Sequence, residues 1–518
     1  MECVKDFELH ELDVRRIQDQ VQDLHRRKQP YHIFHGSTNS TRSAHNDTVV
    51  DISCLRRILK IDPYLQTALV EPTVPMDKLV EATLEVGLMP PVVMEFPGIT
   101  VGGGFSGSAG GSSSFKSGCF SETVREIEIV RADGEVCRAS ASKNTDLFHG
   151  AAGAAGTLGI ITLLELRLVP AKTYVRLTYY PTSSIGEAVD SITRETKDSM
   201  NDYVDGIIYA RNSGVVMAGV LTDTKPPSVN IQRFSGPWDP WFYMHVREQV
   251  QTRLKTGAEG MVDYIPLRDY LFRYDRGAFW VGRECFKYFG FVPFNSLTRW
   301  FLDDFMHTRM LYRALHASNS SFKFMIQDLS LPYSKAQAFV EYTADNLEIW
   351  PLWLCPLRAT QGPTFHPSSN RQGDPQTSPE PMLNIGLCGR ASQDLITFVE
   401  QNRDLERRVR DLDGCKVLYS HTYYTEQEFW DLYDRNGYDK LRERYRATTL
   451  PSIYEKVNVG VYLSELRGKQ SWSEWLWSSW PLPGITGIVA AVRSGDYVYH
   501  RQPIWRRLWE RGVQDKLD

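Results

Sequence analysis

The chain has 518 residues, 42% of them hydrophobic and 24% charged, and its formal net charge is −4 at pH 7; this length allows two to four domains of roughly 150 residues each, and the acidic balance argues against a nucleic-acid-binding protein, which would carry a basic face. It contains no run of about 18 apolar residues, which a membrane-spanning helix needs, and its N-terminus lacks the apolar core of a secretory signal. The eight cysteines include no CxxC pair, which argues against a metal or disulfide framework and for reduced thiols in the cytosol.

The first 172 residues combine short strands with helices, as an α+β unit does. Val14, Ile17, Val21 and Leu24 recur at helical spacing and predict a helix over 8–28. The elements expected after it are a strand at 31–34 running into a small polar loop, strands within 49–53 and 67–75, a helix over 76–87, a hairpin turning at 132–134, and a small-residue helix after 144 that leads into a long strand.

From residue 173 the pattern changes to longer strands and aromatic-rich helices. Strands are expected at 203–210, 214–223, 382–389 and 415–424, and a helical stretch at 295–316. Residues 362–381 are dense in Pro, Ser, Gly and Gln and predict an exposed loop. The tail, residues 461–518, carries Trp472, Trp475, Trp477 and Trp480; it could lie in a membrane interface or cover the second domain.

One stretch, TVGGGFSGSAGGSSSFKSG at residues 100–118, has six glycines before Ser112. Glycine lets a backbone approach a ligand closely, and successive N–H groups can hold an anion. A phosphate-binding P-loop would need glycine before Lys116, where Phe115 stands, and a dinucleotide fingerprint would need a helical period behind the glycines. A purely structural loop and a site for another cofactor remain as alternatives.

Four features occur in a distinctive order: the polar loop HGSTNSTR (35–42), the glycine stretch, the hairpin, and the tiny-residue segment DLFHGAAGAAGTLGIIT (146–162). This order resembles the FAD-binding domain of the vanillyl-alcohol-oxidase and p-cresol-methylhydroxylase (PCMH) type. Within that superfamily the sequence most resembles the Δ24-sterol reductases, because DYIPLRDYLFRYDRGAFW (263–280) and LYSHTYYTEQEFWDLYD (418–434) look like that family's second domain. The resemblance covers about residues 10–457.

The resemblance implies an α+β fold, with a two-subdomain PCMH-type FAD-binding domain (1–172), an α+β substrate or cap domain (173–460) and a Trp-rich extension (461–518). It implies noncovalent FAD, because STNS stands where covalent members of the superfamily carry a histidine, and NADPH as the reductant. The cofactor-binding residues that it implies are Gly36, Ser37, Thr38, Asn39, Ser40 and Thr41; Thr100, Val101, Gly102, Gly103, Gly104, Gly107, Gly110, Gly111, Ser112 and Ser113; and Gly153, Gly156, Thr157, Gly159 and Ile160. Their backbone N–H groups would hold the pyrophosphate, and the bare backbone would make room for the flavin ring.

Reduction of an isolated alkene needs a hydride on one carbon and a proton on the other. His421 and Tyr423 would face the same side of a strand and are candidates for this acid chemistry. Glu428 is a third candidate, although its spacing from Thr425 also fits a helix capping box.

Several other residues near these segments allow two interpretations. Arg268, Arg273, Tyr274 and Arg276 could include a binding site for the phosphate of a pyridine nucleotide, but solvated surface arginines are the favoured interpretation. Trp353 and Cys355 are expected to belong to a core strand.

The leading functional hypothesis is an FAD enzyme that reduces a C=C bond in the side chain of a sterol-like or prenylated terpenoid substrate with NADPH. An oxidase or desaturase that passes electrons to O2, and a noncatalytic flavin-binding protein, are the alternatives, since one fold hosts several chemistries. The expected partner is a lipid-like small molecule and not a nucleic acid. The expected location is the cytoplasm, with peripheral contact to an internal membrane such as the endoplasmic reticulum through residues 461–518.

Overall fold

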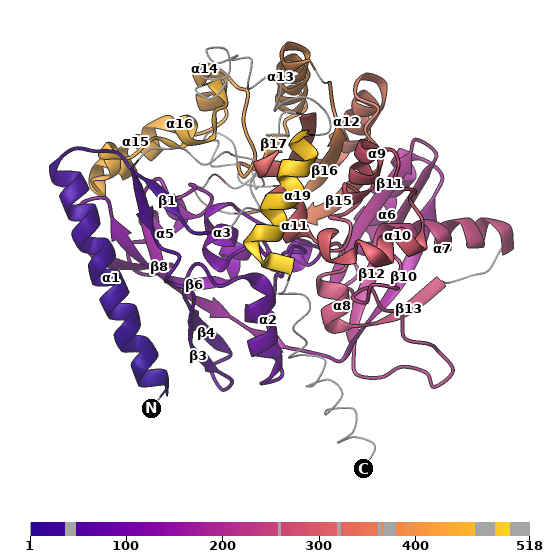
Figure 1. Cartoon of the computed structure of the whole chain (residues 1–518), viewed down its shortest axis with the longest axis horizontal. Helices are drawn as coiled ribbons and strands as arrows, with labels where there is room; N and C mark the ends of the chain where they lie inside the picture. Colours follow the sequence, from indigo (N-terminus) through magenta and orange to yellow (C-terminus); the bar gives the residue numbers. More distant parts are fainter. Residues whose placement is uncertain are drawn as a thin grey trace.

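A computed structural model describes residues 2–36, 48–256, 261–318, 323–360, 365, 380–392, 394–460 and 482–497. It confirms the α+β fold class: two units, each built on its own antiparallel sheet, lie side by side (Figure 1). The predicted residues Ser37, Thr38, Asn39, Ser40 and Thr41, the tryptophans at 472–480 and most of the loop 362–381 lie outside the described residues.

The first unit is built on a five-stranded sheet in the order β3-β4-β8-β6-β7. Its elements are α1 (Glu2–Arg26), β1 (His32–Phe34), β2 (Val49–Asp51), β3 (Ile58–Asp62), β4 (Thr67–Val70), α2 (Met76–Leu84), β5 (Leu88–Met89), α3 (Val101–Ser106), α4 (Ser114–Ser117), η1 (Phe120–Thr123), β6 (Val124–Arg131), β7 (Val136–Ser140), α5 (Thr145–Ala151), β8 (Gly159–Arg167) and β9 (Val169–Pro170). The expected hairpin is β6–β7. The four apolar residues that predicted the first helix are buried against this unit, because their spacing puts them on one face of α1.

The second unit is built on an eight-stranded sheet in the order β13-β10-β12-β11-β15-β16-β14-β17. Its elements, with those that follow it in the sequence, are β10 (Tyr174–Thr182), α6 (Ile185–Glu195), β11 (Tyr203–Ala210), β12 (Ser213–Thr222), α7 (Phe242–Thr256), β13 (Met261–Pro266), α8 (Leu267–Leu271), α9 (Gly282–Phe289), α10 (Ser296–Phe301), η2 (Asp303–Phe305), α11 (Thr308–Ala317), β14 (Phe324–Pro332), α12 (Tyr333–Asn346), β15 (Leu352–Leu357), β16 (Met382–Arg390), α13 (Leu395–Asp411), β17 (Cys415–Lys416), α14 (Glu426–Trp430), α15 (Arg435–Arg444), η4 (Ala447–Thr449), α16 (Ile453–Val457) and α19 (Leu482–Ser494).

The two faces of the larger sheet have different partners. Successive side chains of a strand point to opposite faces, so Leu352 and Leu354 of β15 pack with α6, α12 and α13 in one core. Trp353, Cys355 and Leu357 point the other way and belong to the core that the first unit also builds. This second face of the sheet therefore looks toward the first unit.

The polypeptide returns to the first unit after it has completed the larger sheet. Helices α15 and α16 fall within the predicted second domain, but Tyr438 donates a hydrogen bond to Thr157 (2.8 Å) and Arg444 pairs with Asp146 (2.7 Å). Figure 1 places both helices above α1 and α5. The first unit is thus assembled from two separate parts of the sequence.

Two buried histidines link distant segments by ion pairs. His10 of α1 contacts Glu71 and Glu128 at 2.9 and 3.2 Å, and His307 contacts Asp275 at 2.5 Å. Burial by itself would lower the pKa of each imidazole, but the hydrogen bonds and charges of these carboxylates raise the pKa of both histidines to about 9.

These raised values predict how stability depends on pH. An imidazole with a raised pKa in the folded state contributes stability that is fully present below its unfolded pKa of about 6.5 and is lost as pH rises through the folded pKa. We therefore expect the free energy of unfolding to fall between about pH 6.5 and pH 9, by up to a few kcal/mol per histidine. Melting temperatures of the wild type and of His10→Gln across this range measure the effect; an equal slope in both proteins would contradict it for His10.

Candidate active site

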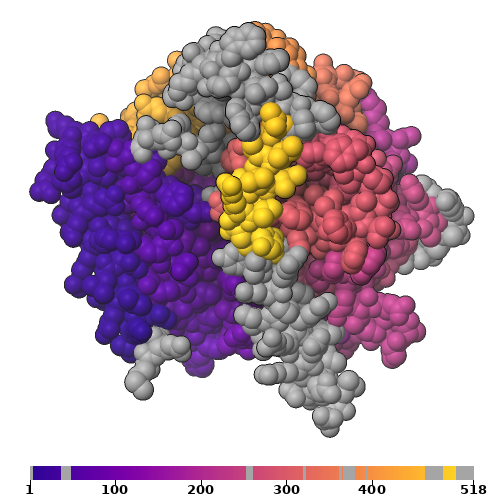
Figure 2. Space-filling view, in the orientation of Figure 1, coloured from indigo at the N-terminus to yellow at the C-terminus, as the bar shows by residue number. Residues whose placement is uncertain are grey.

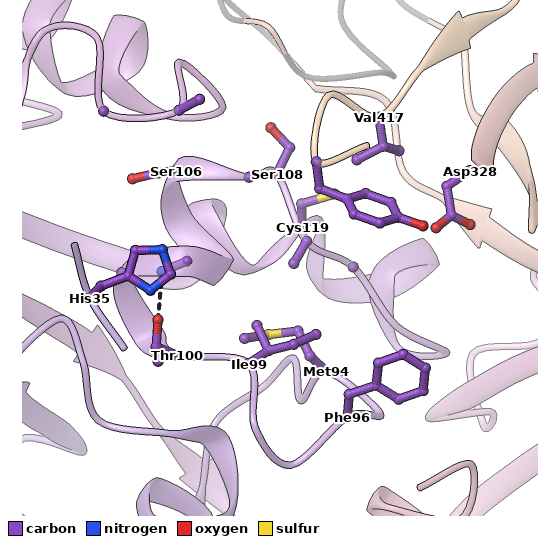
Figure 3. Close-up of a pocket in the computed structure, with 18 of the residues that line it drawn as sticks. His35, Met94, Phe96, Ile99, Thr100, Ser106, Ser108, Cys119, Asp328 and Val417 are labelled. Carbon is purple, nitrogen blue, oxygen red and sulfur yellow. Dashed lines mark hydrogen bonds between the residues drawn. The ribbon is translucent and has the colours of Figure 1, made fainter. Parts of the chain in front are cut away.

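A cavity of about 300 Å³ lies between the two units. One wall comes from the first unit and contains the glycine stretch and the end of β1; the other comes from β14, β15, β16 and the loop after β17. Figure 3 shows His35, Thr100, Ser106 and Ser108 on one side of the cavity and Asp328 and Val417 on another. The cavity thus exists only where both units meet.

The glycine wall contains a short helix that the sequence pattern did not predict. Thr100 caps helix α3, because its hydroxyl accepts the N–H of Gly103 at 3.2 Å. The N–H groups of Gly102, Gly104 and Gly107 donate to backbone carbonyls. The expectation that these N–H groups are available for a pyrophosphate is therefore wrong at these positions, and the glycines contribute mainly the absence of side chains.

The expected cofactor residues divide into two groups among the residues that the structure describes. Those that line the cavity are Thr100, Gly102, Gly103, Gly107, Gly110, Gly156 and Gly159. Those in the packing around it are Gly36, Val101, Gly104, Gly111, Ser112, Ser113, Gly153, Thr157 and Ile160. In the second group, Gly104 is in contact with Met94 and Phe120, where a Cβ would come within 3.0 Å of each.

Two observations test whether this wall fits a large flat cofactor. First, a Cβ built on Gly103 would meet only the Thr100 hydroxyl, so the surface there is backbone facing open space. Second, Ser108 lines the cavity, and its hydroxyl, which lies close to Gly153, is buried with no hydrogen-bond partner among the described residues. A buried polar group of this kind needs a partner, which a bound ligand would supply, so the site fits FAD.

The back of the glycine stretch is held by a buried charge network. Arg273 donates to Asp205 at 2.8 Å and to the Ser112 hydroxyl at 3.2 Å. Tyr274 and Trp353 also donate to Asp205, at 2.8 and 3.1 Å. The favoured interpretation of Arg273 as a solvated surface charge is therefore wrong; the network ties the loop of the first unit to the sheet of the second.

The neighbouring arginines are also paired within the protein. Arg276 is buried against Asp303 at 2.7 Å, and Arg268 contacts Glu81 at 2.7 Å. Both are thus engaged with carboxylates, and neither lines the cavity.

Glu95 adds a titratable group beside the glycine stretch. It accepts the N–H of Ser112 at 3.1 Å and lines the cavity. Burial raises its pKa to about 7, against the opposing charge of Arg273.

The opposite wall presents a second buried carboxyl group, Asp328. Alternation along β14 and β16 directs Asp328 and Asn384 to the cavity face of the sheet. Asn384 donates to Asp328 Oδ1 at 2.8 Å, and Tyr419 makes a second side-chain hydrogen bond to this carboxyl. Burial raises the pKa of Asp328 above that of an exposed aspartate, because desolvation outweighs these two hydrogen bonds. Protonation of Asp328 is thus easier than that of an exposed aspartate.

The three expected catalytic residues lie outside the cavity. The predicted strand 415–424 is only β17, so His421 and Tyr423 do not share a strand face. The His421 carbonyl accepts from buried Lys416, and the Tyr423 N–H donates to Glu406 at 2.9 Å. Glu428 forms the capping box with Thr425. The same segment does reach the cavity, through Val417 and Tyr419.

We expect acid or heat precipitation to release flavin into the supernatant. The reason is that HGSTNSTR offers no histidine where covalent members of the superfamily carry one. His35 does line the cavity, so it is the residue to examine if flavin stays with the precipitated protein. Absorbance of the supernatant and of the redissolved pellet measures both outcomes.

Comparison with known proteins agrees with the geometry. Residues 13–140 match a family model described as an FAD binding domain. The protein is 30% identical over 469 residues to the Delta(24)-sterol reductase of Homo sapiens, covering 87% of this sequence and 86% of the relative. It is 30% identical over 445 residues to that of Arabidopsis thaliana (79% and 76%) and 27% identical over 434 residues to the Delta(24)-sterol reductase homolog of Caenorhabditis elegans (80% and 79%).

Proposed function

Because the protein belongs to the Delta(24)-sterol reductase family and is an FAD-dependent oxidoreductase of that family, we propose that it reduces a C=C bond in the side chain of a sterol-like or prenylated terpenoid substrate, with NADPH as the electron donor. One observation carries the proposal beyond the family. A buried carboxyl group with a raised pKa, Asp328, is held by Asn384 and lies in the same cavity as the glycine wall.

The residues that would hold FAD come from the first unit. The wall of Gly103, Gly107 and Gly156 leaves room for the ring system, and the Ser108 hydroxyl offers an unused hydrogen bond. Lys456 lines the cavity near Gly156 and supplies a positive charge there. When bound, FAD supplies the hydride that adds to one carbon of the alkene.

The second carbon of the alkene needs a proton, and Asp328 is placed to donate it. An isolated alkene has no polar group that could be activated, so the strength and position of the acid matter. Asn384 holds one carboxyl oxygen, which fixes the orientation of the group. Trp353, Cys355 and Leu357 from the same sheet face line the cavity with apolar surface, which limits water around the reacting carbon.

The proposal is tested by following the flavin spectrum of the purified protein. NADPH is added without oxygen, and the reduced protein is then mixed with sterols and prenylated terpenoids and examined by mass spectrometry. Bleaching by NADPH followed by reoxidation with an alkene, with a product two hydrogens heavier, supports the reductase. Fast reoxidation by air with peroxide and no alkene reduction would establish the oxidase instead. A protein that neither contains nor accepts FAD would exclude both.

We also propose peripheral contact with an internal membrane, because the substrate class dissolves in lipid. No described helix is long and apolar enough to cross a bilayer. Helix α19, however, exposes Ile485 and Val489, 45% and 40% accessible, together with Val492.

This contact has a direct test. The full-length protein should sediment with liposomes, since each large apolar residue contributes roughly 1.5–3 kcal/mol when fully buried. A variant with Ile485, Val489 and Val492 all changed to Ser should sediment less and keep its flavin spectrum. Full-length protein that never sediments would contradict membrane contact and favour a soluble or carrier-bound substrate.

A further inference from the structure

A second cavity, of about 390 Å³, adjoins the first and is almost entirely apolar. Its walls come from α9, η2, α11, β14, β16 and α19, with Phe and aliphatic side chains as the main lining. We call it the apolar chamber. Its volume lies within the roughly 300–1,000 Å³ of ordinary small-molecule sites, so it is large enough for a substantial part of a ligand.

The same sheet face forms the floor of both cavities. In β14 and β16, Asp328 and Asn384 lie in the first cavity, whereas Ile326 and its register partner Cys388 lie in the chamber. Alternate residues of a strand share a face, so the floor changes from polar to apolar within one step of the alternation. A ligand that lay along these strands would meet the acid at one end only.

Two aromatic side chains separate the cavities and line both of them. Phe96 comes from the first unit and Tyr312 from α11, and their rings make an edge contact at 6.0 Å between centroids. Figure 3 shows Phe96 at the margin of the first cavity. These two rings, one from each unit, therefore form a boundary that the two cavities share.

Helix α19 closes the chamber on the outside. It lies on the surface of the molecule across the seam of the two units (Figure 2), and its residues Gly484, Gly487, Ile488 and Ala491 line the chamber. The helix sits close to α11, since a Cβ on Gly487 would come within 2.8 Å of the Ala314 carbonyl.

The geometry points to the apolar chamber as the subsite for the unreactive apolar body of the substrate, with α19 as the wall that sets how large this body can be. The inference rests on the proposed function, since the alkene end would have to reach past Phe96 and Tyr312 into the first cavity. The chamber has few polar side chains, among them Glu284 and Ser318. It therefore suits a rigid hydrocarbon body with at most one or two hydroxyl groups.

The chamber is tested by filling it from α19. Ala491 is buried and lines the chamber, so Ala491→Phe places a ring inside it, whereas Arg493→Phe puts the same ring on the exposed side of the same helix. We expect Ala491→Phe to weaken binding of dehydroergosterol, a fluorescent sterol, by roughly tenfold or more, because pocket contacts of one or two carbons already carry such factors. Flavin content and the melting temperature report whether each variant is folded.

The first outcome that overturns the inference is equal sterol affinity in a folded Ala491→Phe variant and in the control. If Ala491→Phe does not fold, the inference is tested by protection of thiols in the wild type. Cys285 and Cys388 line the chamber, so saturating dehydroergosterol should slow their alkylation by an apolar maleimide and leave Cys137 of β7 unchanged. Absence of this protection also overturns the inference.

The outcome of these measurements does not depend on whether the proposed function is correct. Sterol binding and thiol protection need no turnover, so both can succeed in a protein that reduces no alkene. Conversely, the Ala491→Phe variant could reduce the side-chain alkene of a sterol as well as the wild type does. That result would support the proposed function and contradict the role of the chamber. Comparing the KM for a sterol with that for a short prenyl alcohol, in Ala491→Phe and Arg493→Phe, makes this distinction in one assay.

Discussion

Asp328→Asn is expected to slow transfer from reduced flavin to the alkene by roughly 10²–10⁴-fold, the range that a positioned general acid contributes. Asparagine keeps the shape and can still interact with Asn384, but it has no acidic proton to give. Reduction of the flavin by NADPH involves no proton on the substrate carbon and should keep its wild-type rate. Anaerobic stopped-flow absorbance resolves the two half-reactions.

Two further variants make this expectation specific to the carboxyl group. Asp411→Asn makes the same chemical change at an exposed position on α13 and should leave both half-reactions unchanged. Tyr419→Phe removes one hydrogen bond to Asp328 and should slow the second half-reaction less than Asp328→Asn does. A fast Asp328→Asn variant together with a slow Tyr423→Phe variant would instead assign the proton to the first predicted candidates.

Gly156→Val and Gly103→Val are each expected to abolish flavin binding while the second unit stays folded. At Gly156 the backbone has φ of +74° and a Cβ would come within 2.8 Å of Ile33, so a branched residue is strained and also enters the cavity. At Gly103 the φ angle is not positive, so the added methyl groups would act only by occupying space that the flavin needs. The ratio of flavin to protein absorbance measures the loss.

Backbone strain can be separated from occupied space with Gly87→Val. Gly87 has φ of +73°, like Gly156, but a Cβ there meets nothing within 4 Å, and it lies outside the cavity. This variant should therefore lose some stability and keep its flavin. Full flavin occupancy in both Gly103→Val and Gly156→Val would mean that these glycines serve turns and not the ligand.

Residues that act through local patterns could be predicted from the sequence. Helical spacing located α1, the Ala-Asp-Gly turn located the β6–β7 hairpin, and the spacing of Thr425 and Glu428 gave the capping box. The glycine stretch, which the sequence predicts to bind a cofactor, contributes residues to the wall of the first cavity. These features depend on neighbours within about four residues, which the sequence displays directly.

Residues that act through tertiary contacts could not be predicted in the same way. From the sequence alone, Arg273 resembles a surface charge. The fold brings Asp205 of β11, which is 68 positions away, into hydrogen-bond contact with it. Asp328 carried one weak signal, because it is the one charged residue in β14. The strand expected to carry His421 and Tyr423 ended at Lys416 because this buried side chain pairs with Glu406 and holds the following segment as a loop.

The return of α15 and α16 to the first unit has a consequence for how the protein is made. Tyr438 completes contacts with Thr157 that bridge 281 positions, so an emerging polypeptide holds the glycine wall long before the helices that cover it exist. At ribosomal rates of about 5–20 residues per second, this delay is on the order of tens of seconds. During that time the larger sheet can assemble independently, while the first unit still lacks helices α15 and α16. We therefore expect flavin to be incorporated late during biogenesis, and a polypeptide truncated before residue 435 to retain it poorly.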